Sequence, residues 1–159
     1  MNPITRNPLS EEHAKKVGSC LQMMLPKLTD LAIAAKQIHW NVVGTQFLSV
    51  HEKLDEVVDA ARNGADTVAE RMVQLGQPAD GRANIVVEDG KLSESLPTGF
   101  VSVPDGLTLI CDRLIDAVKT NRRAIEGVGK FDPLTEDQLI AIGQELEEQL
   151  WMLQAMEAK

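Results

Sequence analysis

Apolar residues recur at alternating steps of four and three through the middle of the chain, between Phe47 and Leu75. No proline interrupts this stretch. On a helical wheel of ~100° per residue, seven apolar positions fall within roughly 60° either side of Leu54. The pattern predicts one amphipathic helix that turns its apolar stripe toward a core. The seven positions are Leu54, Val58, Ala61, Ala65, Val68, Met72 and Leu75.

The N-terminal part of the chain shows the same helical period up to Gly44. Ser10 is followed by two acids and has the features of a helix N-cap, so we expect a helix to start there and residues 1–9 to form a flexible arm. Pro26 interrupts the period. Because an interior proline costs ~3 kcal/mol and removes a backbone hydrogen bond, we expect one kinked long helix, or two shorter helices as the weaker alternative.

Two further helices are predicted in the C-terminal half of the chain. One starts at Asp105, after Pro104, and continues with a regular apolar stripe to residues 127–129. The other starts at Pro133 or Leu134 and continues to about Met156. Both have one apolar face, which is typical of helices packed in a bundle.

A long segment, residues 77–104, separates the first two helices from the last two. Three prolines and three glycines break any period in it. We expect residues 85–87 to pack against a helix and a short helical turn to form near residues 91–96. Antiparallel neighbours in a bundle need only ~2 to 8 connecting residues, so a link of this length implies that the third helix returns to the other end of the bundle. The predicted fold is an all-α, ferritin-like four-helix bundle, a single domain over residues 10–159 with a long crossover between helices 2 and 3.

The composition supports one aliphatic core. The chain has 159 residues, of which 43% are hydrophobic, 3% are aromatic and none is tyrosine. That is enough for a single domain packed from aliphatic side chains. The net charge of −8 works against a general affinity for nucleic acid or anionic membrane and favours the attraction of cations.

The chain also has features that bear on its compartment. It lacks a basic start followed by an apolar stretch, and no apolar run approaches the ~20 residues that span a bilayer. We therefore expect a cytoplasmic protein without membrane contact. Cys20 and Cys111 lie far apart within apolar runs, which favours buried, reduced thiols over a disulfide.

Four side chains of metal-ligand type form a second stripe along one flank of the middle helix. They make two pairs at i, i+4, and residues four apart on a helix project side by side, so each pair could share a metal ion. Acids in such a position usually form only a solvated face. His39 strengthens the metal hypothesis, because Gly44 ends the preceding helix and the chain then turns back, which brings His39 beside the next helix. The four residues are His51, Asp55, Asp66 and Glu70.

The distance between the two pairs determines whether one chain alone could build the metal site. With a rise of ~1.5 Å per residue, the centres of the pairs lie about 22 Å apart, so no single metal site can use both from one chain. If all five residues belong to one centre, a two-fold mate must lay its copy of this helix antiparallel. Asp66 and Glu70 of one chain then meet His39, His51 and Asp55 of the other, and the isologous dimer builds two identical sites.

Two segments around these residues carry a family resemblance. HWNVVGTQF, which begins at His39, and ADTVAERMVQLG, which begins at Ala65, resemble the two signature segments of the Dps family, dodecameric mini-ferritins that oxidise and store iron. The spacing of the five candidate ligands matches that family, and a similar pattern continues in LEEQLWMLQA near the C-terminus. Ala65 is a departure, because the family usually has a larger apolar residue there.

The resemblance implies a function and an assembly. It implies a ferroxidase that oxidises Fe(II) with hydrogen peroxide, or with O2, stores ferric oxide in a hollow homododecamer of 23 symmetry and so protects against oxidative stress. Two imidazoles and three carboxylates suit iron in both oxidation states, and other divalent metals such as Zn also fit them. For Trp40, next to His39, we weigh a sacrificial electron donor equally against a structural interface residue.

Weaker candidates extend this picture. Glu52, Glu56 and Asp59 continue the acidic flank and would either face the cavity of a shell and nucleate ferric oxide or remain solvated charge. The turn at residues 131–137 resembles the family's acidic three-fold pore, in which Asp132 and Asp137 would line the channel for iron. The alternative for Asp132 is a helix cap.

Two other functions compete with iron oxidation. The first is a DNA-coating protein associated with the nucleoid, as the family name suggests. It is disfavoured because the N-terminal arm contains a single basic residue, Arg6, and no basic tail follows the last helix. The second is a helical bundle without metal, which would make the spacing of the five ligand-type residues a coincidence.

Overall fold

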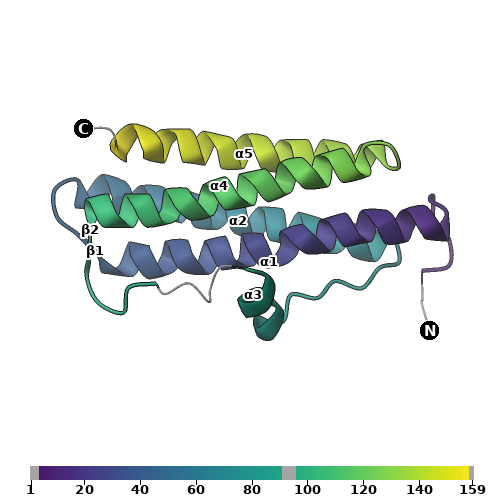
Figure 1. Cartoon of the computed structure of the whole chain (residues 1–159), viewed down its shortest axis with the longest axis horizontal. Coiled ribbons are helices and arrows are strands. Elements are labelled where there is room, and N and C mark those ends of the chain that lie inside the picture. Colours follow the sequence, from purple (N-terminus) through teal and green to yellow (C-terminus); the bar gives the residue numbers. More distant parts are fainter. Residues whose placement is uncertain (1–3, 91–95, 158–159) are drawn as a thin grey trace.

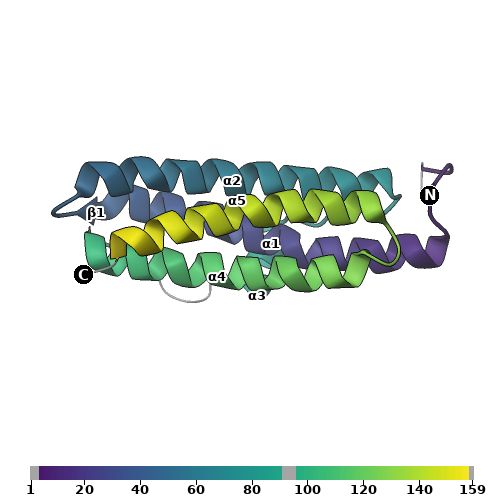
Figure 2. The ribbon, with the colours of Figure 1, turned by 90° about the horizontal axis from the view of Figure 1, so that it is seen from above.

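The computed structural model describes residues 4–90 and 96–157, and four long helices dominate it (Figure 1). They are α1 (Glu11–Asn41), α2 (Phe47–Gln74), α4 (Val103–Val128) and α5 (Pro133–Glu157). Helix α1 packs against α2 and α4, and α5 packs against α4 and α2. The result is an elongated bundle in which the start of α1 and the end of α5 lie at opposite ends (Figures 1 and 2). The predicted all-α, ferritin-like bundle is confirmed.

The core is aliphatic, and the periodic stripe of α2 belongs to it. Six of its seven positions are buried, whereas Ala65 is half-buried at the edge. Leu139, Leu146, Leu150 and Leu153 are the matching buried positions of α5. The face predicted from the helical wheel therefore packs inward.

Helix α1 is continuous through Pro26, which is buried within it. This excludes the alternative of two shorter helices. The Ser10 side chain accepts a hydrogen bond from the His13 amide at 3.2 Å, so the predicted N-cap is confirmed. Ahead of it, the side chain of Asn7 donates to the Leu75 carbonyl at 2.6 Å, which ties the described part of the arm to the end of α2.

The end of α1 differs from the prediction. The helix stops at Asn41, three residues before Gly44, because β1 (Val42–Val43) is extended and pairs in parallel with β2 (Val101–Ser102). The following turn needs backbone that glycine favours, with φ of 119° at Gly44 and 67° at Gln46.

The crossover contains structure that the sequence did not predict. Helix α3 (Ala83–Asp89) packs against α1 and buries Val86, so the expected contact of residues 85–87 takes a helical form. The helical turn predicted near residues 91–96 lies almost entirely outside the described residues. Helix α4 starts two residues earlier than expected, because Ser102 caps it and accepts from the Asp105 amide at 3.3 Å.

Both cysteines are free thiols. Cys111 is buried, and burial raises the pKa of its thiol to about 12. Cys20 is only half-buried, contrary to the prediction that both would be buried, and burial raises the pKa of its thiol as well. No helix in the described ranges is long and apolar enough to cross a membrane.

Candidate metal centre

Two histidines meet where α1 ends and α2 begins. His39 lies in the last turn of α1 and His51 lies near the start of α2. Their rings stack with centroids 3.6 Å apart and planes inclined by 22°. The tight turn through Gly44 reverses the chain and causes this contact, as the sequence predicted.

Reciprocal hydrogen bonds fix both imidazoles. Nδ1 of His39 lies 2.8 Å from the carbonyl oxygen of His51, and Nδ1 of His51 lies 2.9 Å from that of His39. A carbonyl oxygen can only accept, so each Nδ1 carries the proton and donates it. In a neutral ring, Nε2 then keeps its lone pair. That is the tautomer of a metal-binding histidine whose other nitrogen donates to a backbone carbonyl.

Asp55 lies next to this pair and is held by a lysine. Its Oδ1 is 3.5 Å from Nδ1 of His39 and accepts a hydrogen bond from Lys36. The Lys36 hydrogen bond is the main cause that lowers the pKa of Asp55, and it outweighs partial desolvation. Sequence reasoning missed Lys36, although its position one turn before His39 on α1 was a usable signal.

Asp66 and Glu70 lie further along α2 and are exposed. Within the described ranges neither forms a hydrogen bond or an ion pair. No group of three or more His, Cys, Asp or Glu side chains in the same ranges is arranged to hold a metal ion. A single chain therefore presents two histidines and one carboxylate at one place and two free carboxylates at another.

Glu70 lines a small groove of about 390 Å³, whereas Asp66 borders a larger open groove of about 790 Å³ between α1 and α2. Asp66, Trp40, Lys36 and Arg62 line it together with alanines and other small or apolar residues. Trp40 is 67% exposed and Ile33, also in the lining, is 46% exposed. This face thus combines exposed apolar surface with Trp40 and one candidate metal ligand, Asp66.

The weaker acidic candidates border a different groove. Glu52, Glu56 and Asp59 are exposed on α2. Glu56 and Asp59 line a groove of about 580 Å³ between α2 and α5, together with Asp137 and Glu145. Lys53 Nζ lies 2.7 Å from a carboxylate oxygen of Glu56 and partly neutralises it.

Asp132 is placed differently from its neighbour Asp137. Its side chain is buried, lies 2.7 Å from Arg71 Nη2 and accepts from the Thr135 hydroxyl. Burial alone would raise the pKa of Asp132, but the hydrogen bonds from Thr135, Arg71 and the Leu134 amide lower it overall. This carboxylate caps α5 and is not on the surface, so a channel for iron would depend on the exposed Asp137.

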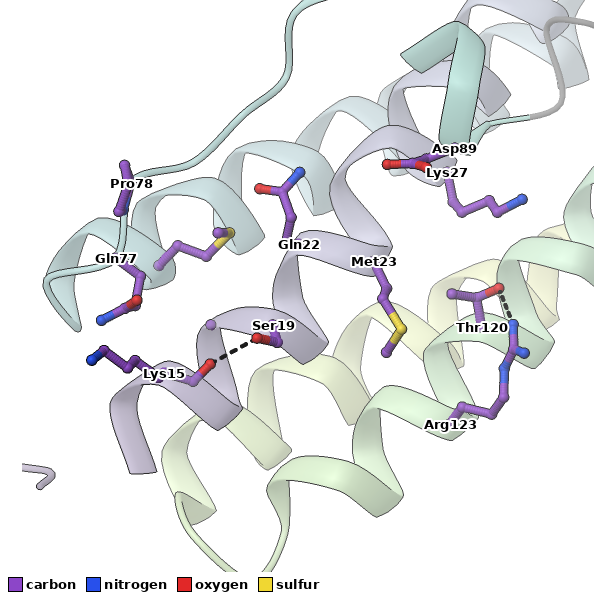
Figure 3. Close-up of a pocket in the computed structure, with 12 residues that line it drawn as sticks. Lys15, Ser19, Gln22, Met23, Lys27, Gln77, Pro78, Asp89, Thr120 and Arg123 are labelled. Carbon is purple, nitrogen blue, oxygen red and sulfur yellow. Dashed lines mark hydrogen bonds between the residues drawn. The ribbon is translucent and has the colours of Figure 1, made fainter. Parts of the chain in front are cut away.

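A third groove, of about 740 Å³, lies along the first half of α1 and contains none of the candidate ligands (Figure 3). Its polar groups serve local contacts. Ser19 Oγ donates to the Lys15 carbonyl and Arg123 donates to Thr120 Oγ1, each at 3.0 Å. Gln22 forms two hydrogen bonds with the backbone of Asp80.

The bundle, the crossover and the paired histidines define a ferritin-like protein, and residues 19–159 match the family of the ferritin-like domain. The chain is 36% identical over 152 residues to the DNA protection during starvation protein of Agrobacterium fabrum, covering 95% of this chain and 93% of that protein. It is 39% identical over 139 residues to the fine tangled pili major subunit of Haemophilus ducreyi, and the match covers 87% of this chain and 73% of that protein. The structure of Dps from Microbacterium arborescens in the high iron form matches with a TM-score of 0.91 at 33% identity, and the match covers 97% of this chain and 100% of that chain. The chain belongs to the Dps family.

Proposed function

We propose that this protein is a ferroxidase that removes and stores iron and so protects against oxidative stress. Pairs of chains oxidise Fe(II) at centres shared across a dimer interface, and twelve chains enclose the ferric product. The observation that carries the proposal is the division of the ligand set. Among the residues that the structure describes, one chain supplies His39, His51 and Asp55 with no hydrogen bond to either Nε2, and the remaining carboxylates are exposed and unpaired about 22 Å away.

The chemistry of the shared centre follows from its donors. Two ferrous ions each give one electron to hydrogen peroxide, which takes up two protons and leaves as two molecules of water. Carboxylate oxygens stabilise the harder ferric ions, and the imidazoles favour binding of the ferrous ions. Because both electrons pass at one site, little hydroxyl radical escapes. Trp40 beside His39 can intercept a stray oxidant by giving up an electron.

Acidic side chains outside the centre have supporting roles in this proposal. Asp137 lines a channel through which iron reaches the cavity. Glu52, Glu56 and Asp59 are candidates to nucleate ferric oxide, with Glu56 weakened by its pairing with Lys53. The name of the Agrobacterium fabrum relative, DNA protection during starvation protein, favours DNA protection as a second function. The chain's charge of −8 argues against it.

Complementation between two inactive chains tests the shared centre. One chain carries His51→Ala and Asp55→Ala, and the other carries Asp66→Ala and Glu70→Ala. In a heterodimer one centre has both lesions and the other has none. Equal amounts, refolded together so that chains re-pair at random, should recover about a quarter of the wild-type rate of peroxide-driven Fe(II) oxidation.

Each variant refolded alone is the matched control and should stay inactive. Centres built within one chain cannot complement in this way. Mixed shells that assemble but show no activity would therefore refute the shared arrangement.

A further inference from the structure

Arg62 is a basic side chain within the row of acidic groups along α2. It lies one helical turn before Asp66, is exposed and lines the same groove as Trp40. In the part of the chain that the structure describes, Arg62 forms no hydrogen bond or ion pair, although Asp66 at i+4 and Asp59 at i−3 are within helical reach. Its guanidinium is therefore free to meet a group from another chain.

The register of the shared centre decides what that group is, and this inference rests on the proposed function. In the shared centre, Asp66 of one chain meets the partner's Asp55 on antiparallel copies of α2. A step of four residues back from Asp66 leads to Arg62. Because the helices are antiparallel, it is matched by a step of four residues forward from Asp55, which leads to Asp59. We propose that Arg62 forms an ion pair with the partner's Asp59, made twice by the two-fold axis and located between the two metal centres.

The direction of the side chains agrees with this register. On the helical wheel Arg62 and Asp59 lie at roughly 80° and 140° from Leu54. Both angles fall within the roughly 60° to 160° covered by the four ligand-type residues of α2. The exposed face of α2 that carries those ligands therefore also carries Arg62, at its edge nearest α1, and Asp59, at its edge nearest α5.

The ion pair would reduce the repulsion between the two acidic faces that meet at the interface. Between Leu54 and Glu70, Arg62 is the only basic residue of α2, and the same stretch contains five acids. Two such stripes laid against each other repel unless a cation lies between them, and complementary charges also fix the register of an interface. Arginine suits this role because its planar fork pairs with a carboxylate through two hydrogen bonds. Asp59 then sets the register of the dimer, and of the three acids proposed above to nucleate ferric oxide, Glu52 and Glu56 remain for that role.

A charge swap tests the pair. Arg62→Glu sets two acids against each other at both copies, and Asp59→Arg sets two bases against each other. Each single variant should raise the dissociation constant of the assembly about tenfold or more, and the double variant should return it to within about threefold of the wild-type value. Mass photometry over a dilution series at low ionic strength measures these constants. Lys119→Glu, the same charge change on an exposed lysine of α4, is the control and should have no effect.

The outcomes separate this pair from the shared centre. An assembled wild type whose double variant is no better than either single variant overturns the ion pair and leaves the shared centre intact. A wild type that stays monomeric overturns both. If circular dichroism shows that a reversed chain does not fold, Arg62→Gln, Asp59→Asn and their combination form a double-mutant cycle. Strictly additive losses in that cycle would count against the pair, and a double variant no weaker than either single would support it.

Discussion

At the scale of single residues, Lys36 is a side chain that occupies one candidate ligand of the proposed metal centre. It donates a hydrogen bond to Oδ1 of Asp55, an oxygen that a metal ion would use, and it adds a positive charge beside a site for cations. A metal must therefore displace the lysine before it can bind this oxygen.

Replacing Lys36 should strengthen metal binding. We expect Lys36→Met to raise the affinity for Zn(II), a redox-inert divalent cation, by about fivefold at neutral pH, because both the competing donor and the repelling charge are lost. Isothermal titration calorimetry measures the affinity. Lys27→Met is the matched control, since Lys27 is paired with Asp116 at 2.9 Å, away from the centre. Equal affinities for the wild type and Lys36→Met would show that the lysine does not compete with the metal.

Sequence spacing identified the five candidate ligands because it reports what helix geometry repeats. The i, i+4 pairs on α2 and the return of His39 to His51 both follow from local rules. Lys36 was missed because a lysine near a carboxylate is common on helix surfaces. Which lysine contacts Asp55 depends on how α1 packs against α2 in the folded protein. For Asp132 the sequence left a channel and a helix cap as alternatives, because the burial of this side chain depends on Arg71, a residue far away in the sequence.

At the scale of elements, the Arg71–Asp132 pair joins the last turns of α2 to the connection between α4 and α5. Arg71 also donates from Nε to Thr135 Oγ1 at 2.9 Å, so one guanidinium binds two residues at the start of α5. It directly follows Glu70, one of the carboxylates that the proposed centre takes from the partner chain. The contacts of Arg71 with Asp132 and Thr135 therefore fix the end of α2 from which the Glu70 carboxylate projects.

Asp132→Asn should weaken the contact between Arg71 and residue 132, and the resulting loss of stability should depend on pH. We expect a loss of about 1–3 kcal/mol in the free energy of unfolding at neutral pH, because a buried charge-assisted hydrogen bond is lost. The folded-state pKa of Asp132 is lowered, so its contribution is complete above the ordinary Asp pKa of ~3.9 and disappears as the pH falls through the lowered folded value. Urea unfolding midpoints from pH 7 downward should therefore converge for the two proteins in acid. Asp137→Asn, an exposed neighbour, is the control, and a constant difference at all pH values would contradict this account.

The sequence predicted the four long helices well and the short elements poorly. Long helices repeat their apolar signal over many turns, so their existence does not depend on distant residues. The β1–β2 pair does depend on them, because Val42 and Val43 become extended only when Val101 and Ser102 are beside them. That distant pairing ended α1 at Asn41 before the glycine that marks the turn.

At the scale of the whole molecule, the net charge favours the proposed iron storage over DNA coating. The charge of −8 is repeated in every copy of an assembly, and DNA is bound chiefly through lysine and arginine. We expect the assembled protein to leave duplex DNA unshifted in a gel at physiological salt and neutral pH. A strong shift that disappears on adding a chelator would reveal bridging by a divalent cation. A strong shift that survives the chelator would contradict the argument from charge.

The stacked histidines also have a consequence for the order in which the molecule folds. Only twelve residues separate His39 from His51, whereas sixty separate Gln37 from Pro97, whose side-chain-to-carbonyl hydrogen bond at 2.9 Å fastens the crossover to α1. Closing a short loop costs less entropy than closing a long one, and local contacts form sooner. The histidine half of the proposed metal centre therefore belongs to a hairpin of α1 and α2 that a growing chain can form before its C-terminal helices are complete. In that proposal Asp66 and Glu70 join it only when two finished chains meet, so the proposed oxidation of iron begins no earlier than assembly.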